Sequence, residues 1–414
     1  ETANNTLYIG NETVSLRTTE TVIEEFVIPS EWPKGDYFLI IEANYFDMYS
    51  RTTTVFELFE PIQNYKVFGL VELWKVLTVL GVLAFILGLV LYIRREINKR
   101  KRFHAKVEYK LLPKKGPRSL YVGKIAETEN DTYFDMDKLT VHSIVAGSTG
   151  GGKSISAQVI IEECLMKDVA VIVIDPTAQW SGMLRKCQDQ KMMSYYPRFH
   201  LTKKSSRAFN GNVRAIMNPL EKVDLLKFWK PGEIQVITTS TLDPKGMDIF
   251  VANTVRQVFK SNLKEYRGLR FMMVYDEVHR LLPKFGGTGE GFVQIERACR
   301  EFRKWGIGVM LISQVLADFV GQIKANINTE VQMKTRDESD LARIKDKYGA
   351  SFIQELVKSP VGSGMVQNSS WNRGLPYYVT FRPILHSVVR LSDEELEKYN
   401  KYNFIHLVPS LHIE

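Results

Sequence analysis

The feature that most constrains this chain is an uncharged apolar segment in its first quarter. Residues 76–93 read VLTVLGVLAFILGLVLYI, eighteen residues without a charge. That is close to the length with which a helix spans the hydrocarbon core of a bilayer. Six basic residues and one acidic residue follow in 94–102, and a basic flank marks the cytosolic end of a span. We therefore predict a transmembrane helix over residues 70–93, with the preceding residues outside the cell and the following residues in the cytosol.

The segment before this helix is acidic and has the pattern of short strands. Residues 1–60 hold eleven acidic and three basic residues, although the 414-residue chain has a net charge of +8. The rest of the chain is therefore strongly basic, which suits a polyanionic partner or an anionic membrane face. We expect a small extracellular β-sandwich-like domain over residues 1–64 and a basic cytosolic linker over residues 94–118. Alternating apolar residues and turn residues predict five strands, at 7–9, 14–17, 22–28, 37–43 and 53–59.

Cysteine content excludes two classes of site. The three cysteines are Cys164, Cys187 and Cys299, and none of them forms a C-x-x-C pair. An odd number without paired spacing argues against both a disulfide framework and a zinc site. We expect each cysteine to be a small core residue.

A phosphate-binding motif follows the linker. After the apolar residues 144–146, the sequence GSTGGGKS matches G-x-x-x-x-G-K-[ST] in full. Its glycines let backbone N–H groups turn towards phosphate oxygens, and the helix predicted over residues 156–166 adds the positive potential of its N-terminus. The expected ligand is ATP with Mg²⁺, with Lys153 on the β- and γ-phosphates and Ser154 on the metal. The predicted nucleotide-binding residues are Gly147, Ser148, Thr149, Gly150, Gly151, Gly152, Lys153 and Ser154.

Two later apolar strands end in polar residues that suit the same chemistry. The strand at 271–275 leads into Asp276 and Glu277, and the strand at 308–312 leads into Ser313 and Gln314. We predict that Asp276 completes the Mg²⁺ shell through water, that Glu277 is the general base, and that Gln314 senses the γ-phosphate. Strands alternating with helices over residues 140–335 predict an α/β fold, with a largely parallel RecA-like sheet and the site at its carboxyl edge.

Several runs of residues resemble the HerA/FtsK branch of P-loop motors. They are Tyr121–Lys124, Phe134–Leu139 with His142, Asp175-Pro176, and the block Arg300–Gly308 ahead of Ser313-Gln314. The match covers roughly residues 118–395, including Arg382-Pro383 and His386, so we assign residues 119–414 to a HerA-like ATPase domain. The resemblance implies a hexameric ring that moves double-stranded DNA without sequence preference. It also implies an arginine finger that acts on the neighbouring subunit's nucleotide, with Arg303 favoured over Arg300.

Two departures from the family pattern matter. Gln179 stands where the family usually has glutamate, which puts any metal or coupling role of that acid in doubt. A membrane anchor and an outer β-domain stand in place of most of the β-barrel of soluble HerA proteins. This arrangement is similar to that of the membrane ATPase of the crenarchaeal DNA-exchange (Ced) import system. It is more distantly similar to the coupling ATPases of conjugation machines.

Three functions are compatible with these residues. The main hypothesis is a membrane-anchored, hexameric ATPase that moves DNA across the cell membrane together with an integral-membrane pore partner. The second is a secretion or pilus-assembly ATPase with protein cargo, or a conjugation-type coupling ATPase. The third is a nucleotide-gated scaffold, which the set Lys153, Asp276 and Glu277 disfavours. DNA contacts are expected from Lys203, Lys204 and Arg207, and from the glycine-rich loop at 286–291.

Overall fold

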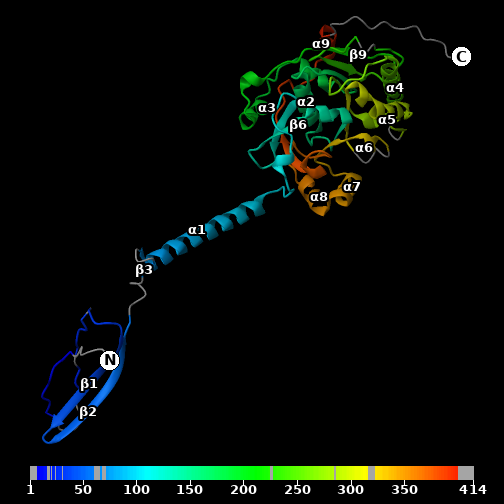
Figure 1. Cartoon of the computed structure of the whole chain (residues 1–414). Coiled ribbons are helices and arrows are strands. Elements are labelled where there is room, and N and C mark those ends of the chain that lie inside the picture. The colour runs from blue at the N-terminus through cyan, green and yellow to red at the C-terminus, as the bar shows by residue number, and fades with distance from the viewer. Residues whose placement is uncertain are drawn as a thin grey trace. The chain divides into compact units, whose positions relative to one another are not determined.

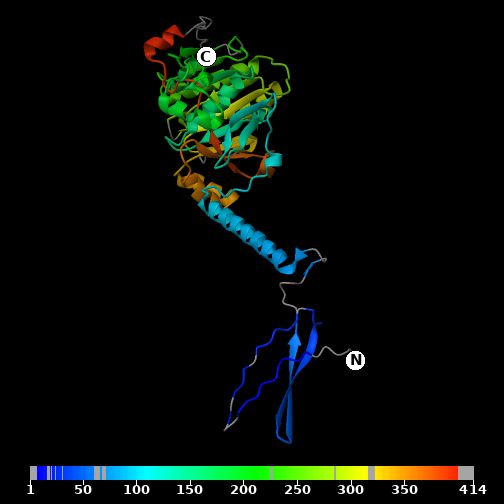
Figure 2. The same cartoon turned by 90° about the vertical axis from the view of Figure 1, so that its left-hand side faces the viewer.

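The computed structural model divides the chain into two compact units, Glu1–Arg100 and Lys101–Glu414 (Figures 1 and 2). The structure describes residues 7–15, 19, 21–23, 25–29, 31–59, 66–67, 71–223, 227–283, 286–315 and 322–399.

The first unit contains a long β-hairpin. Strands β1 (Gly35–Tyr45) and β2 (Met48–Leu58) pair antiparallel, with Gly35 opposite Leu58. The short β3 (Lys66–Val67) and β4 (Val71–Glu72) form a second two-stranded sheet. The last two of the five predicted strands are thus confirmed, whereas the described residues of the first three hold no strand. A strand needs partners to be stable, and in the described part of residues 1–64 the strands form one two-stranded hairpin. The sandwich-like domain stays a prediction.

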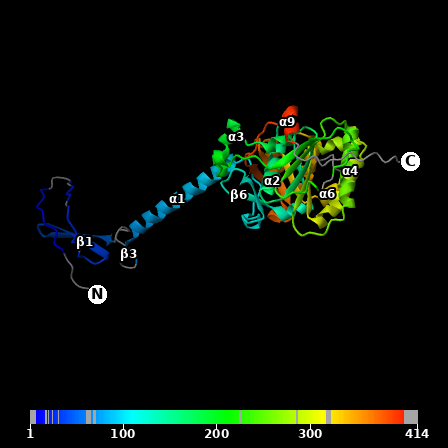
Figure 3. The same ribbon diagram turned by 90° about the horizontal axis from the view of Figure 1, so that it is seen from above.

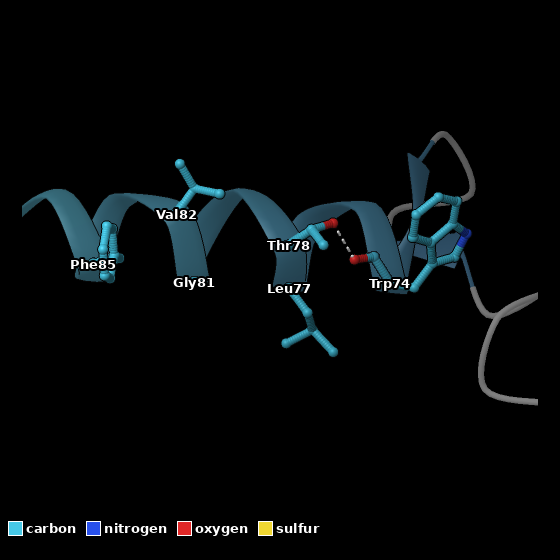
Figure 4. A pocket seen from close by; sticks show the side chains of 6 residues that line it. All are labelled: Trp74, Leu77, Thr78, Gly81, Val82 and Phe85. Carbon is cyan, nitrogen blue, oxygen red and sulfur yellow. Dashed lines mark hydrogen bonds between the residues drawn. The ribbon is translucent and has the colours of Figure 1, made fainter.

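Helix α1 (Leu73–Arg100) contains most of the helix predicted over residues 70–93, and Val71–Glu72 form β4 instead. Its segment Leu73–Ile97 has a mean hydropathy of 2.8 and no buried residues, so by length and composition it is suited to crossing a membrane. One polar group in this segment is satisfied within the helix itself. In Figure 4, the hydroxyl of Thr78 donates to the backbone carbonyl of Trp74 at 2.7 Å, beside Gly81. Such a bond lets a threonine lie among apolar residues without an unsatisfied donor.

The second unit is built on one large mixed sheet. Seven strands run parallel in the order β13-β7-β12-β11-β8-β10-β9, and β14, β15, β5 and β6 extend the β13 side in antiparallel pairs. The predicted RecA-like α/β fold with a largely parallel sheet is therefore confirmed. The strands are β5 (Ser119–Ile125), β6 (Asp131–Asp135), β7 (Ser143–Ala146), β8 (Ala170–Asp175), β9 (Gly211–Ala215), β10 (Ile234–Thr238), β11 (Phe271–Tyr275), β12 (Ile307–Ser313), β13 (Thr329–Met333), β14 (Ser363–Asn368) and β15 (Tyr377–Phe381).

Helices cover both faces of this sheet, because successive residues of its apolar strands point to opposite faces. Helix α2 packs on one face, and α4 and α5 pack on the other (Figure 3). Each face has its own buried core, and Cys164, Cys187 and Cys299 are all buried, as predicted. The helices are α2 (Lys153–Leu165), α3 (Gln190–Ser194), α4 (Pro244–Lys260), α5 (Glu290–Glu301), α6 (Gln322–Asn326), α7 (Glu338–Tyr348), α8 (Ala350–Val357) and α9 (Asp393–Lys398).

The end of the expected linker belongs to this second unit. The ring of Phe103 stacks on Tyr378 with centroids 4.3 Å apart, and the backbone N–H of His104 donates to the Glu355 carboxylate at 3.0 Å. The side chain of Asn372 donates to the carbonyl of Lys106 at 3.0 Å. Residues from 103 onwards are therefore packed on the ATPase body.

Candidate nucleotide site at the carboxyl edge of the sheet

The phosphate-binding loop joins β7 to α2. Gly147, Gly150 and Gly152 have φ values of 153°, 76° and 96°, a range that favours glycine. A Cβ on Gly147 would lie 2.7 Å from the Cβ of Met333, so this turn also needs glycine for space. The loop is fixed from β13, because the N–H and the hydroxyl of Ser148 both donate to the carbonyl of Lys334 at 2.9 Å. The result is a rigid cradle at the N-terminus of α2, while Thr149 is exposed at its tip.

The lysine of this loop meets the residues that end β11 and β12. The Lys153 Nζ lies 3.1 Å from the Oε1 of Glu277, and Gln314 Nε2 donates to the Oε2 of Glu277 at 3.4 Å. The Nδ1 of His279 is 3.2 Å from the same Oε2. The structure thus brings together three residues that the sequence predicted for one site. Glu277 has a φ of +48°, which is uncommon for a residue other than glycine and is often found at functional sites.

A second set of contacts surrounds Asp276. Its Oδ2 accepts a hydrogen bond from the indole Nε1 of Trp180 at 2.9 Å, and its Oδ1 accepts the N–H of Glu277 at 2.9 Å. Asp175, which ends the adjacent strand β8, is fully buried. Burial raises the pKa of Asp276 to about 7, and the charge of Asp175 adds to this rise. Burial likewise raises the pKa of Asp175.

These residues fit a divalent cation. Two buried carboxylates at adjacent strand ends, with a raised pKa, form a site in which a cation is favourable. Ser154, which carries a hydroxyl, lies in the first turn of α2. In the described part of the chain there is no cluster of three or more His, Cys, Asp or Glu side chains placed to hold a metal. A serine hydroxyl and carboxylates are oxygen donors of the kind that suit Mg²⁺, which keeps several waters and takes phosphate oxygens as ligands.

A buried ionic cluster positions helix α2 from its other end. The two guanidinium nitrogens of Arg382 lie 2.7 and 2.9 Å from Glu162 and Glu163, and the side chain of Arg382 is 1% exposed. The Oε1 of Glu162 also accepts the N–H of Leu385 at 2.6 Å and lies 2.6 Å from the Nδ1 of His386. Together these bonds anchor α2 to the segment that directly follows β15. They thereby also hold the phosphate-binding loop at the start of α2.

Other predicted residues lie away from this cradle. Arg300 and Arg303 are exposed and precede β12, at the amino edge of the sheet, so they are not part of the same subunit's site. Lys203, Lys204 and Arg207 are exposed. The loop at 286–291 is held in place, because buried Asp248 accepts the N–H groups of Thr288 and Gly291 at 3.0 and 2.9 Å. The N–H of Glu290 donates to the same carboxylate at 3.1 Å, and the role of this loop in DNA contact stays a prediction.

Sequence reasoning missed three residues of the site. Trp180 follows Gln179, the residue that departs from the family pattern, and Gln179 itself is exposed. His279 follows Glu277 by two residues, which is the only sequence signal that could have suggested it. Lys334 contributes only its carbonyl, and a backbone acceptor has no signature in the sequence.

Comparisons with known proteins agree with this geometry. Residues 120–221 match the family model described as "Helicase HerA, central domain". The "DNA double-strand break repair helicase HerA" of Sulfurisphaera tokodaii is 29% identical over 152 residues, which are 34% of this chain and 30% of that protein. The protein of the same description from Saccharolobus solfataricus is 25% identical over 157 residues, 36% of this chain and 31% of its own. This chain contains a HerA-like P-loop ATPase domain.

The HerA-like chain spans about a third of the length of these curated relatives. One solved structure similar to it is VirB4 of Thermoanaerobacter pseudethanolicus. The match has a TM-score of 0.43 and 12% identity, and covers 64% of this chain and 97% of that one. Another is the conjugation coupling protein TcpA of pCW3, with a TM-score of 0.39, 15% identity, and coverage of 68% and 70%.

Proposed function

We propose that this protein is a membrane-anchored, ring-forming ATPase that uses ATP hydrolysis to move DNA across the cell membrane. The observation that carries the proposal is the convergence of Lys153, Glu277 and Gln314 at the phosphate-binding loop of a HerA-like domain. The same chain contains α1, which is long and apolar enough to cross a membrane.

The contacts support hydrolysis of a nucleoside triphosphate. Lys153 is held by Glu277 across 3.1 Å, and the same ammonium group is placed to bind β- and γ-phosphate oxygens. When it does so, Glu277 is released to accept a proton at its carboxylate from the attacking water, as a general base. Gln314 bonds to the other oxygen of Glu277 and orients this carboxylate. Ser154 and Asp276 are the residues that would hold Mg²⁺, which when bound neutralises charge on the phosphate oxygens.

Assembly into a ring is supported by the position of the two candidate arginines. Arg300 and Arg303 are exposed on the opposite edge of the sheet from the P-loop of their own subunit. An arginine in that position reaches a nucleotide only on a neighbouring subunit, where it stabilises charge that develops in phosphoryl transfer. We propose a hexamer, with Arg303 as the finger.

DNA as cargo is supported by two features. The curated relatives are named as DNA double-strand break repair helicases, and the basic body of this chain suits a phosphate backbone. Lys203, Lys204 and Arg207 are exposed and offer sequence-independent phosphate contacts. Anchoring by α1 favours transport across the membrane, together with an integral-membrane pore partner, over repair in the cytosol.

The test is ATP hydrolysis by the detergent-solubilised full chain, with and without double-stranded DNA, across a salt series. We expect DNA to stimulate hydrolysis and the stimulation to fade with added salt, because counterion release makes phosphate contacts salt-dependent. Glu277→Gln is the control that ties the activity to this site. Hydrolysis that depends on Glu277 but ignores DNA at every salt concentration would rule out DNA as cargo. It would favour the protein-secretion function instead.

A further inference from the structure

The most distinctive contact outside the predicted site residues is made by a tryptophan. The indole Nε1 of Trp180 donates to the Oδ2 of Asp276 at 2.9 Å, and the Trp180 side chain is fully buried. An indole has one donor and no acceptor, so a buried tryptophan must find a partner for a single N–H group. Here that partner is the acid that directly follows β11, 96 residues along the chain.

The segment between β8 and Trp180 is built to aim this ring. The Oδ1 of Asp175 accepts the N–H and the hydroxyl of Thr177, both at 2.8 Å, and its Oδ2 accepts the N–H of Trp180 at 2.8 Å. Ala178 has a φ of +58°, a conformation that its methyl group disfavours. Its carbonyl accepts the Ser181 hydroxyl at 2.6 Å. Local strain and this number of bonds fix the indole in one orientation.

The consequence falls on the carboxylate of Asp276. Its two oxygens are held by donors from different segments, Oδ1 by the N–H of Glu277 and Oδ2 by Trp180. The terminal torsion of an aspartate is broad, so one donor from the adjacent residue fixes the carboxylate plane poorly. Two donors fix it well, and leave the remaining lone pairs of both oxygens in defined directions.

We propose that Trp180 is a positioning residue for Asp276, and that its indole N–H sets the carboxylate orientation needed by the Mg²⁺ of a bound nucleotide. This inference rests on the proposed function, because it requires that the site binds Mg²⁺ with a nucleoside triphosphate. Residues that orient a metal-binding group through a hydrogen bond typically change metal affinity by about tenfold or more when they are replaced.

The test compares nucleotide affinity with and without Mg²⁺. The full chain is titrated with AMP-PNP, a non-hydrolysable ATP analogue, first in Mg²⁺ and then in EDTA, and the ratio of the two Kd values gives the enhancement by Mg²⁺. Trp180→Phe keeps an aromatic ring and removes the donor. A chain with 3-benzothienylalanine at position 180 keeps the shape of the indole and has sulfur in place of the N–H group. Trp371→Phe is the matched control, because Trp371 is also buried, 3% exposed, and its ring lies 4.8 Å from that of Phe134 in the core.

We expect the enhancement by Mg²⁺ to fall by about tenfold in both chains altered at position 180. Affinity in EDTA should stay unchanged in both, and Trp371→Phe should match the wild type in both conditions. An unchanged enhancement in the benzothienylalanine chain would overturn the inference, because that chain lacks only the N–H group. Equal losses of affinity in Mg²⁺ and in EDTA would also overturn it, and would assign Trp180 a packing role. If the unaltered chain itself bound no AMP-PNP, the proposed function would fail instead.

Discussion

Helix α2 carries one buried charged cluster at its first residue and another on its second half, and the two differ in how their charges are balanced. The first, here the edge cluster, consists of Lys153, Asp175, Asp276 and Glu277, with Trp180 and Gln314 as hydrogen-bond donors. The second, the anchor cluster, consists of Glu162, Glu163, Arg382 and His386.

In the anchor cluster, both carboxylates have a positively charged partner within the cluster. Glu162 and Glu163 share Arg382, and two backbone N–H groups and a histidine bond to Glu162. Burial alone would raise the pKa of Glu162, but the charge of Arg382 and the hydrogen bond with His386 hold it below its ordinary value.

The edge cluster has three carboxylates and one lysine, and the pKa of Asp276 is raised to about 7 by burial and by Asp175. The excess negative charge of this site favours binding of a cation, and it lets Lys153 bind phosphate while the carboxylates pair with that cation. The comparison therefore separates a cluster whose charges stabilise the fold from one whose charges suit a nucleotide and its metal ion.

The largest expected difference between the clusters concerns turnover. Glu277→Gln should lower the rate of ATP hydrolysis by about 10²–10⁴-fold, because it removes the general base. The thermal midpoint of the ligand-free chain should change little, because glutamine at this half-buried position keeps a carbonyl oxygen that can accept a hydrogen bond from Lys153. Phosphate release and differential scanning calorimetry on the same sample measure both. If the loss in free energy of unfolding were as large as the rise in activation free energy, Glu277 would serve mainly to stabilise the fold, as Glu162 does.

Breaking the anchor cluster should instead affect stability. Arg382→Met should lower the free energy of unfolding by about 3–5 kcal/mol, because it leaves two buried carboxylates without their cation. Urea denaturation of the full chain measures this, with Arg300→Met as the matched control. Arg300 is half exposed and pairs with Glu296 at 3.6 Å on the helix surface, so its loss should change stability by no more than about 0.5 kcal/mol. Equal effects of the two substitutions would mean that the anchor cluster contributes nothing beyond a surface pair.

The pH dependence of stability should differ between wild type and Asp276→Asn. The folded-state pKa of Asp276 is raised from 3.8 to about 7, so the protonated form favours folding. Its contribution is fully present below pH 4 and is lost as the pH rises through 7. Without Mg²⁺, Asp276→Asn should therefore gain stability relative to wild type between pH 5 and 8, on the order of 3 kcal/mol.

Denaturation of both chains at each pH measures this difference. Groups that do not interact with Asp276, such as buried His142 with its pKa lowered to about 4 by burial, are common to both chains and cancel. A constant difference across this range would show that Asp276 does not titrate there.

The smallest effect on stability is expected for the exposed arginine that precedes β12. Arg303→Ala should change the free energy of unfolding by less than about 0.5 kcal/mol and yet abolish hydrolysis. Mixing it with Glu277→Gln should restore part of the activity, because some neighbouring pairs then combine an intact Glu277 with an intact Arg303. The rate of phosphate release from re-assembled mixtures measures the recovery. If these mixtures stayed inactive and mixtures of Arg300→Ala with Glu277→Gln recovered activity instead, Arg300 would be the arginine finger.

The sequence by itself determined the parts of this protein that depend on neighbouring residues. The phosphate-binding loop needs glycines, Lys153 and Ser154 in one continuous run, and the buried strands β8, β11 and β12 are continuous apolar runs ending in polar residues. Helix α1 follows from uninterrupted apolar length. Local backbone preference and hydrophobic periodicity dictate these elements, so they can be read without a partner.

Only the tertiary structure decided which distant residues meet. The contact between Trp180 and Asp276 joins residues 96 positions apart, and that between Arg382 and Glu162 joins residues 220 positions apart. The strands predicted at 7–9 and 22–28 do not form in the described residues. Their alternating pattern is present, but a pattern alone does not supply a neighbouring strand to pair with. Contacts across a sheet depend on strand order and register, and those are set by burial of the whole domain rather than by any segment of its sequence.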